Sequence, residues 1–271
     1  RSARERVDEV VFAYSDVSHE QVMHVASRAL AAGADFRVLE PERTMVRAEL
    51  PVIAVCAVRT GSGKSQISRW LGSRLRAAGL RVAVLRHPMP YGDLERQRVQ
   101  RFSAVEDLDE ADCTIEEREE YEPHIVAGNL VFAGVDYEAI VRAAEAEADV
   151  IVWDGGNNDF PLVRPDLLIV LTDALRPGHA DEYFPGEAVM RMADVVVVNK
   201  VDAASVEQIE LATREAKELN PEVPIVRARS PVTLEEPEAV RGKRVLVIDD
   251  GPTLTHGGMA YGAGYVAAVA A

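Results

Sequence analysis

The stretch Pro51–Leu71, PVIAVCAVRTGSGKSQISRWL, decides the fold. It opens with an apolar run, Val52–Val58, which is short and rich in β-branched residues, as expected of a buried strand. A turn containing Gly-Lys-Ser at 63–65 follows, and after it come apolar residues at helical spacing up to Gly79. Strand, glycine-rich turn and helix in this order are the context that a phosphate-binding loop requires. The stretch therefore predicts a P-loop.

The predicted loop would direct backbone N–H groups at a nucleotide phosphate, and the following helix would add the positive end of its dipole. We expect Lys64 to reach the β- and γ-phosphates and the Ser65 hydroxyl to ligate Mg²⁺. The usual G-x-x-x-x-G-K-[ST] pattern has glycine where this chain has Val58, so Gly61 is expected to supply the flexibility. An ordinary βα turn is the alternative. The nucleotide-binding residues predicted here are Thr60, Gly61, Ser62, Gly63, Lys64 and Ser65.

Composition limits the partners of the protein. The chain has 271 residues with 48% hydrophobic, enough for one large domain or one and a half. Thirty basic and 45 acidic residues give a net charge of −15, which argues against a nucleic-acid partner. There is no apolar run of membrane-spanning length and no signal-peptide pattern, so we expect no membrane association and a cytoplasmic location. Cys56 and Cys113 fit no metal-ligand spacing and are expected to be reduced.

Residues 1–50 are predicted to form a strand, a helix and a strand, in the manner of the tail of a preceding α/β domain whose start is missing. The helix is expected at Ser18–Ala32, with Ser18 as its N-cap and Gln21 completing a capping box. The preceding SDVSH segment, 15–19, either touches a ligand or only caps this helix. Pro41–Glu49 would then be a linker to a P-loop domain over residues 51–271. The two strands are expected at Val10–Tyr14 and Phe36–Leu39.

From Pro51 onward, apolar strand patterns alternate with helical ones, which predicts an α/β fold with a doubly wound, mostly parallel sheet of P-loop NTPase type. In such a sheet the ligand lies at the carboxyl ends of the strands. A charge-dense segment, 96–128, interrupts the alternation and predicts two or three short helices, either a solvated insertion or a lid or subunit contact. The predicted strands after the first are Arg81–Leu85, Leu130–Val135, Val150–Trp153, Leu167–Leu171, Val195–Val198, Ile225–Arg227 and Arg244–Ile248.

Two predicted strands end in chemically active residues. Asp154 follows an apolar strand and would hold Mg²⁺ directly or through water, as the second conserved element of P-loop enzymes does. Asp159, five residues later, is a candidate base or second metal contact. Arg86 and His87 follow the Arg81–Leu85 strand and begin a loop that we expect to contact an anion. The catalytic residues predicted from sequence are therefore Lys64, Asp154 and Asp159.

Three later segments complete the predicted site. Arg176 and His179 follow the predicted Leu167–Leu171 strand and are candidate ligands of a substrate phosphate; an ordinary loop is the alternative. Asn199, Lys200 and Asp202 form an N-K-x-D motif, in which the carboxylate reads guanine and the lysine stem covers the base. The glycine-rich stretch 249–264 would supply backbone donors and His256 to a second phosphate; plain packing of a terminal element is the alternative.

With these residues assembled, the chain resembles the cyclic 2,3-diphosphoglycerate synthetase family. The resemblance covers essentially the whole chain, and it implies an internal portion of a longer protein. It rests on SDVSHEQVMH (15–24), CAVRTGSGKSQ (56–66), RHPMPYGDL (86–94), DCTIEEREEYEPH (112–124), VWDGGNNDFP (152–161), LTDALRPGH (171–179), VVVNKVD (196–202) and DDGPTLTHGGMAYGAGY (249–265).

The resemblance implies an ATP-dependent ligase that closes 2,3-diphosphoglycerate into a cyclic anhydride, with Mg²⁺ as cofactor. The γ-phosphoryl group would activate one substrate phosphate, which its neighbour then displaces. Arg86, His87, Arg176 and His256 are the expected ligands of this small anionic phosphorylated metabolite. The N-K-x-D motif favours guanine, so GTP is possible, and a GTPase of switch or metallochaperone-like type that binds a protein partner is the alternative. A homo-oligomer is also possible.

Overall fold

An eight-stranded sheet forms the centre of the protein, as seen in a computed structural model that describes residues 7–87, 89, 92–156, 159–249, 254 and 259–271. Its strands are β4 (Val52–Ala57), β5 (Val82–Arg86), β6 (Gln100–Phe102), β7 (Leu130–Ala133), β8 (Val150–Asp154), β9 (Leu167–Asp173), β11 (Val195–Asn199) and β12 (Ile225–Arg227). The order across the sheet is β12-β11-β9-β4-β8-β5-β7-β6. Every neighbouring pair is parallel except β6 and β7. The prediction of a mostly parallel α/β sheet is confirmed.

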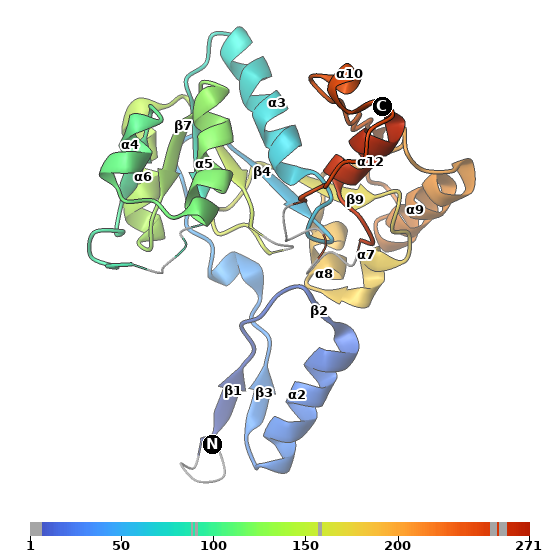
Figure 1. Ribbon diagram of the computed structural model, residues 1–271. Helices are drawn as coiled ribbons and strands as arrows, with labels where there is room; N and C mark the ends of the chain where they lie inside the picture. Colours follow the sequence, from blue (N-terminus) through green and yellow to red (C-terminus); the bar gives the residue numbers. More distant parts are fainter. Residues whose placement is uncertain (1–6, 88, 90–91, 157–158, 250–253, 255–258) are drawn as a thin grey trace.

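Helices cover both faces of this sheet (Figure 1). The helices α3 (Lys64–Ala77) and α5 (Ile115–Val126) pack on one face, where Leu71 lies against valines of β5 and β8. The opposite face carries α6 (Tyr137–Glu147), α8 (Gly186–Met192) and α9 (Val206–Leu219) around fully buried Trp153. This is the doubly wound arrangement, and it brings the carboxyl ends of β4, β8, β9 and β11 to one edge. The remaining helices are α4 (Glu106–Glu110), α7 (His179–Glu182), α10 (Pro237–Val240) and α12 (Ala263–Ala270).

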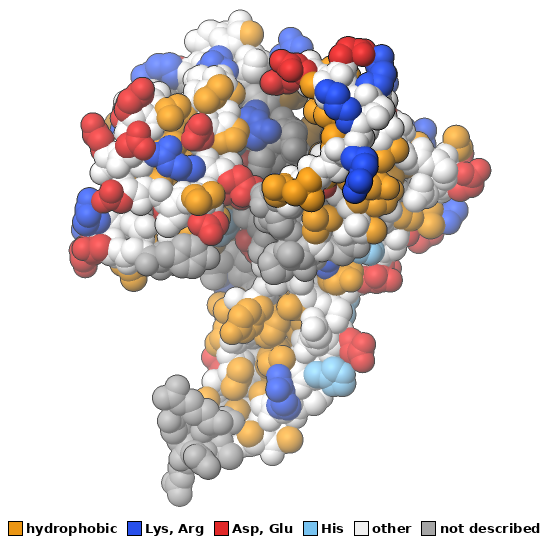
Figure 2. Space-filling model, in the orientation of Figure 1, with side chains coloured by type: hydrophobic (Ala, Val, Ile, Leu, Met, Phe, Trp, Pro, Cys, Tyr) orange, Lys and Arg blue, Asp and Glu red, His pale blue; other side chains and the backbone are white. Residues whose placement is uncertain are grey.

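Residues 7–39 form a small βαβ unit outside the main sheet. Strands β1 (Glu9–Val11) and β3 (Asp35–Arg37) pair in parallel, and α2 (His19–Ala31) connects them. The predicted capping box of α2, formed by Ser18 and Gln21, is present. Figure 1 shows this unit projecting away from the main sheet, with η1 (Pro41–Arg43) in the connection. Figure 2 shows hydrophobic side chains on its surface.

A short strand pair is one of the contacts between the βαβ unit and the main body. β2 (Val17–Ser18) lies antiparallel to β10 (Tyr183–Phe184), which precedes α8. The contact places the SDVSH segment beside the P-loop instead of at the free end of the unit. The division of the chain into two domains near residue 50 stays a prediction.

One predicted strand is wrong, whereas the short helices predicted for the charged segment 96–128 are present as α4 and α5. Residues 244–248 form no strand, because Leu246 and Ile248 are 88% and 87% exposed and have no neighbouring strand to cover them. The charged segment 96–128 is more than a solvated insertion. It supplies β6 to the edge of the sheet, and α5 buries Tyr121 and His124 completely beneath a charged outer surface.

Two further findings, on membrane-spanning helices and on the cysteines, apply to the described part of the chain only. None of its helices combines the length and the apolar character needed to cross a membrane. Cys56 and Cys113 are both free thiols, and burial raises the pKa of Cys56 to about 12.

Candidate nucleotide site

The P-loop connects β4 to α3, and two glycines give it its shape. Gly61 and Gly63 have φ angles of +78° and +103°, a region that glycine occupies without steric cost. A Cβ on Gly63 would also lie 2.4 Å from Nδ2 of Asn199. Gly61 thus supplies the flexibility that Val58 cannot, as expected from the sequence.

Lys64 is the first residue of α3 and only 7% of it is exposed. Burial lowers the pKa of its ammonium group, while the nearby Asp154 carboxylate opposes that shift. The side chain thus lies in a poorly solvated position at the start of a helix, where burial disfavours its charged form. An anionic phosphate group would be strongly attracted there.

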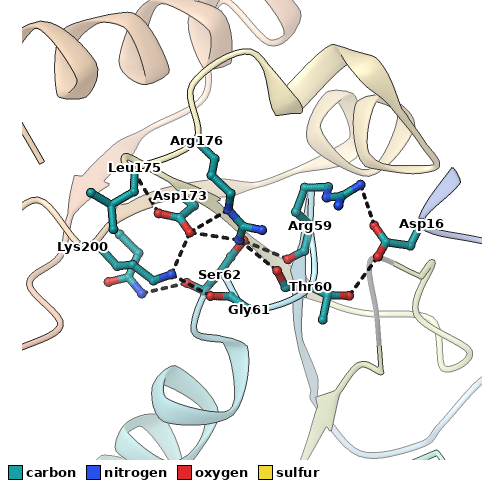
Figure 3. Close-up of polar contacts among 10 residues, drawn as sticks. Asp16, Arg59, Thr60, Gly61, Ser62, Asp173, Leu175, Arg176 and Lys200 are labelled. Atoms are coloured by element: carbon teal, nitrogen blue, oxygen red, sulfur yellow. Dashed lines mark hydrogen bonds and ion pairs between the residues drawn. The ribbon is translucent and has the colours of Figure 1, made fainter. Parts of the chain in front are cut away.

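Donors from the neighbouring strand ends hold the backbone of the loop (Figure 3). Nη2 of Arg176 donates to the Thr60 carbonyl at 2.8 Å, Nζ of Lys200 to the Gly61 carbonyl at 2.7 Å, and Nδ2 of Asn199 to the Ser62 carbonyl at 2.8 Å. Three successive carbonyl groups are therefore occupied on one side. We expect this bracing to preorganise the loop, so that its N–H groups can serve a bound phosphate.

Asp173, which the sequence analysis did not single out, links two of these donors. Its carboxylate is 1% exposed and lies 2.9 Å from Nη2 of Arg176 and 2.7 Å from Nζ of Lys200. The signal was present in the sequence, because Asp173 stands at the carboxyl end of a buried strand like Asp154. A phosphate-binding role for Arg176 stays a prediction, and in the structure this guanidinium supports the loop. Burial and the charge of Arg176 lower the pKa of His179.

The N-K-x-D motif lies at the end of β11, where the fold places it beside the P-loop. Asn199 and Lys200 both contact the loop, and Lys200 has a positive φ of 60°. Asp202 is exposed, and its Oδ1 accepts a hydrogen bond from the Ser230 amide at 2.7 Å. Base recognition by Asp202 stays a prediction.

Asp154 lies at the end of β8 and is fully buried. Its Oδ2 is 2.7 Å from Nη1 of Arg86 and 2.9 Å from Nε2 of His124. Arg86 also forms an ion pair with Glu120 of α5. Burial by itself would raise the pKa of Asp154, but Arg86, then His124 and Lys64, more than offset it and hold the pKa far below its usual value. The carboxylate therefore stays ionised.

The surroundings of Asp154 fit the expected Mg²⁺. Its Oδ1 is buried without a hydrogen-bond partner in the described structure, and Ser65 lies in the first turn of α3. No group of three or more His, Cys, Asp or Glu side chains in the described ranges could hold a metal alone. Mg²⁺ in nucleotide sites takes most of its ligands from phosphates and water, so one carboxylate and one hydroxyl suffice.

His87 and Asp159 form a second pair of polar side chains. Nε2 of His87 is 3.3 Å from Oδ2 of Asp159, and Nδ1 is 3.0 Å from the Tyr137 hydroxyl. Burial opposes ionisation of Asp159, but hydrogen bonds with His87 and Ser15 lower its pKa overall. A Cβ on Gly156 would lie 2.7 Å from the His87 ring, so this glycine permits the close approach.

A residue of the N-terminal unit also reaches the loop. Asp16 has a positive φ of 57°, and its Oδ1 is 3.2 Å from Nη1 of Arg59. Its Oδ2 accepts a hydrogen bond from the Thr60 hydroxyl at 3.2 Å. The Arg59 guanidinium stacks on Tyr183 of β10, 3.7 Å from the ring centroid. Sequence analysis placed the SDVSH segment near a possible ligand but did not identify this ion pair. His256, the remaining predicted site residue, lies outside the described residues.

The sheet, the glycine-rich loop and the helix after it form an α/β fold of the P-loop nucleoside triphosphatase type. Over 262 residues, 97% of this chain, it is 60% identical to an arginine synthetase, ArcE, of Thermococcus kodakarensis. It is 27% identical over 213 residues, 71% of the chain, to a cyclic 2,3-diphosphoglycerate synthetase of Pyrococcus furiosus. The chain spans 58% and 48% of the lengths of these two relatives. No protein-family model matches it.

These relatives refine the resemblance found in the sequence. The chain is related to cyclic 2,3-diphosphoglycerate synthetases, but the relative with 60% identity carries a different name. The GTP-hydrolysing alternative gains no support from them. Among solved structures, LpxK of Aquifex aeolicus in complex with ATP aligns at 18% identity and a TM-score of 0.46, over 77% of this chain and 60% of that one. HypB of Archaeoglobus fulgidus aligns at 16% identity and a TM-score of 0.41, over 77% and 88%.

Proposed function

We propose that this chain is the nucleotide-binding part of an ATP-dependent synthetase that forms arginine. The P-loop and its surroundings supply a site for a nucleoside triphosphate. Identity to a named arginine synthetase is much higher than identity to the named cyclic 2,3-diphosphoglycerate synthetases. The choice between the two acceptors is supported by one observation, the charge balance around the P-loop.

Cationic side chains at the strand ends already have carboxylate partners. Arg86 is paired with Asp154, and Arg176 and Lys200 share Asp173. Arg59 is paired with Asp16. A substrate with several phosphate charges would have to break buried ion pairs, and this leaves a carboxylate without its counterion. Among the described residues, the charges therefore favour an acceptor with little net negative charge.

The proposed chemistry has two steps. Arginine differs from the corresponding ureido amino acid by nitrogen in place of oxygen on the terminal carbon. The ureido oxygen would attack the γ-phosphorus of ATP, so that a C–O–P linkage forms, the β,γ-bridging P–O bond breaks and ADP leaves. Ammonia would then add to the same carbon, and the C–O bond would break as phosphate departs with its electron pair. A proton leaves the incoming nitrogen in this step.

The residues described above have assigned parts in this proposal. Lys64 and the loop N–H groups would bind the β- and γ-phosphates and stabilise the charge that develops during transfer. Ser65 and Asp154 would hold Mg²⁺, which neutralises phosphate charge when bound. Asp159, fixed by His87 and Ser15, is the candidate acceptor for the proton of the attacking nitrogen.

The direct test is an acceptor and nucleotide comparison with the full-length protein. ADP and GDP release would be measured from ATP and GTP with Mg²⁺, with no acceptor, with the ureido amino acid plus ammonium, or with 2,3-diphosphoglycerate. We expect ATP turnover to require both the ureido compound and ammonium, with one arginine formed per ADP. Chromatography of the amino-acid products provides this ratio.

Other results would overturn the proposal in distinguishable ways. Stimulation of ATP turnover by 2,3-diphosphoglycerate without arginine formation would identify the acceptor as the phosphorylated metabolite expected from sequence. Slow GTP turnover whose rate neither acceptor changes would indicate a regulatory GTPase.

A further inference from the structure

His124 stands out because a helix of the charged insertion carries it into the interior of the nucleotide site. It lies near the end of α5 and is fully buried. The same helix brings Glu120 to Arg86. Two α5 side chains thus reach the residues around Asp154, although the sequence of this segment predicts a surface insertion.

Both ring nitrogens of His124 have polar neighbours. Nδ1 lies 3.3 Å from Nδ2 of Asn129, and Nε2 lies 2.9 Å from Oδ2 of Asp154. If the Asn129 amide donates to Nδ1, the proton of a neutral ring resides on Nε2 and is donated to the carboxylate. Asn129 is itself 2% exposed and lies against Gly72 of α3, which leaves no room for a Cβ there. Asn129 therefore fixes the orientation of the His124 ring at Nδ1, while Nε2 contacts Asp154.

The two oxygens of Asp154 differ in their partners. Nε2 of His124 and Nη1 of Arg86 both contact Oδ2. Oδ1 is buried and has no hydrogen-bond partner in the described structure. Arg86 already provides the counterion for this carboxylate, so a second donor is not needed to neutralise its charge. What His124 adds is a second direction of restraint, because two donors on one oxygen limit rotation of the carboxylate about χ2. Oδ1 is then the oxygen left for another ligand.

We infer that His124 is a positioning residue, which orients Asp154 from the insertion so that Oδ1 faces the Mg²⁺ of the bound nucleotide. The inference rests on the proposed nucleotide site but not on the identity of the acceptor. It also gives the insertion a role as the outer support of the metal-binding carboxylate. Outer partners of metal ligands typically change metal affinity or activity by about 10–100-fold when they are removed.

Two substitutions separate this role from simple filling of space. In His124→Gln, the side-chain amide nitrogen can occupy the place of Nε2 and still donate to Asp154. In His124→Asn, the amide is one methylene shorter and corresponds to Nδ1, so it does not reach the carboxylate. Both variants place an uncharged amide in the same buried position. Ile125→Ala is the control, because Ile125 packs in the hydrophobic cluster that α4 and α5 form with β6 and β7 and does not contact Asp154.

The readout is ADP binding by calorimetry with and without Mg²⁺, using full-length protein and no acceptor. We expect His124→Asn to reduce the Mg²⁺-dependent gain in ADP affinity by about tenfold or more while metal-free ADP affinity stays the same. His124→Gln should retain most of the Mg²⁺-dependent gain in ADP affinity. Ile125→Ala should lower the unfolding temperature but leave that gain unchanged.

Equal losses in the Asn and Gln variants, or a loss in Ile125→Ala as large as that in His124→Asn, would overturn the positioning role. Failure of the arginine proposal would be visible separately. In that case the turnover assay would yield no arginine, while Mg²⁺-dependent ADP binding and its dependence on His124 would remain.

Discussion

At the scale of single residues, Lys64 shows a conflict between stability and function. Its ammonium group is buried at the start of α3, where burial lowers its pKa, and Asp154 is already paired with Arg86 and His124. A buried charge with incomplete compensation destabilises the protein. Binding sites retain such groups because a ligand supplies the missing counter-charge.

Lys64→Met should therefore separate stability from binding. The substitution keeps most of the volume and removes the charge, so we expect the nucleotide-free protein to gain about 1 kcal/mol in free energy of unfolding. Nucleotide turnover should fall by about 10²-fold or more, because a preorganised charge contact with the transferred group is lost. Thermal unfolding without nucleotide and ADP release from ATP measure the two effects. Turnover at the wild-type rate would remove Lys64 from the proposed chemistry.

At the scale of secondary-structure elements, buried strands and capped helices were the predictable part of the fold. The capping box of α2 and the bounds of β12 match the predictions, because capping residues and apolar runs define them locally. Arg244–Ile248 has the same apolar pattern, yet it remains exposed without a neighbouring strand. A strand depends on its partner as much as on its own residues.

The site was predictable in the same uneven way. Lys64, Asp154 and Asn199 stand at or after the carboxyl ends of strands, where ligands bind in such sheets, so the sequence was enough to identify them. His124 and Asp16 interact over long sequence separations, which no local pattern indicates, whereas Asp173 stands at a strand end and could be found in the same way as Asp154. His124 in particular stands in a segment dense in charge, where sequence alone favours a solvated helix. Its burial depends on how α5 packs against β7 and β5.

A pair at the opposite edge of the sheet makes stability depend on pH. Asp149 and Arg81 immediately precede the neighbouring strands β8 and β5, and Asp149 accepts hydrogen bonds from the Arg81 side chain and amide. These contacts lower the pKa of Asp149 from 3.8 to about 2. The unfolded chain therefore binds this proton more readily, so the stabilisation is complete above the unfolded pKa and is lost as pH falls towards 2.

Asp149→Asn should flatten this part of the acid response. We expect the variant to be less stable than wild type near neutral pH and to lose less additional stability between pH 4 and pH 2. Urea unfolding at several pH values in that window provides the comparison. Parallel curves for the two proteins would contradict the assignment.

At the scale of the whole molecule, the contact between the βαβ unit and the P-loop is small but chemically specific. The β2–β10 pair and the Asp16–Arg59 ion pair hold the unit beside the loop, and both side chains of the ion pair are less than 10% exposed. Breaking a buried pair leaves the remaining charge uncompensated. The unit is thus coupled to the loop that the nucleotide would contact.

Asp16→Asn tests this coupling. Asparagine tolerates the positive φ at this position, so the backbone should be kept while the charge is lost. We expect the free energy of unfolding to fall by about 3 kcal/mol, and combination with Arg59→Met to recover part of the loss. Asp8→Asn, at an exposed residue of the same unit, is the control for a change of net charge. Denaturant unfolding of wild type, Asp16→Asn, Arg59→Met and the double variant gives the coupling energy, and simple additivity would argue against a shared ion pair.

The path of α5 has a consequence for engineering this scaffold. Residues 96–128 look like an excursion from the sheet that a shortened design could omit, since β7 would still pair with β5. Such a truncation would remove His124, which contacts Asp154, and Glu120, which pairs with Arg86. A minimal nucleotide-binding version of this protein must therefore keep α5, and α4 with it, because buried Leu108 of α4 packs in the same cluster as Tyr121 of α5.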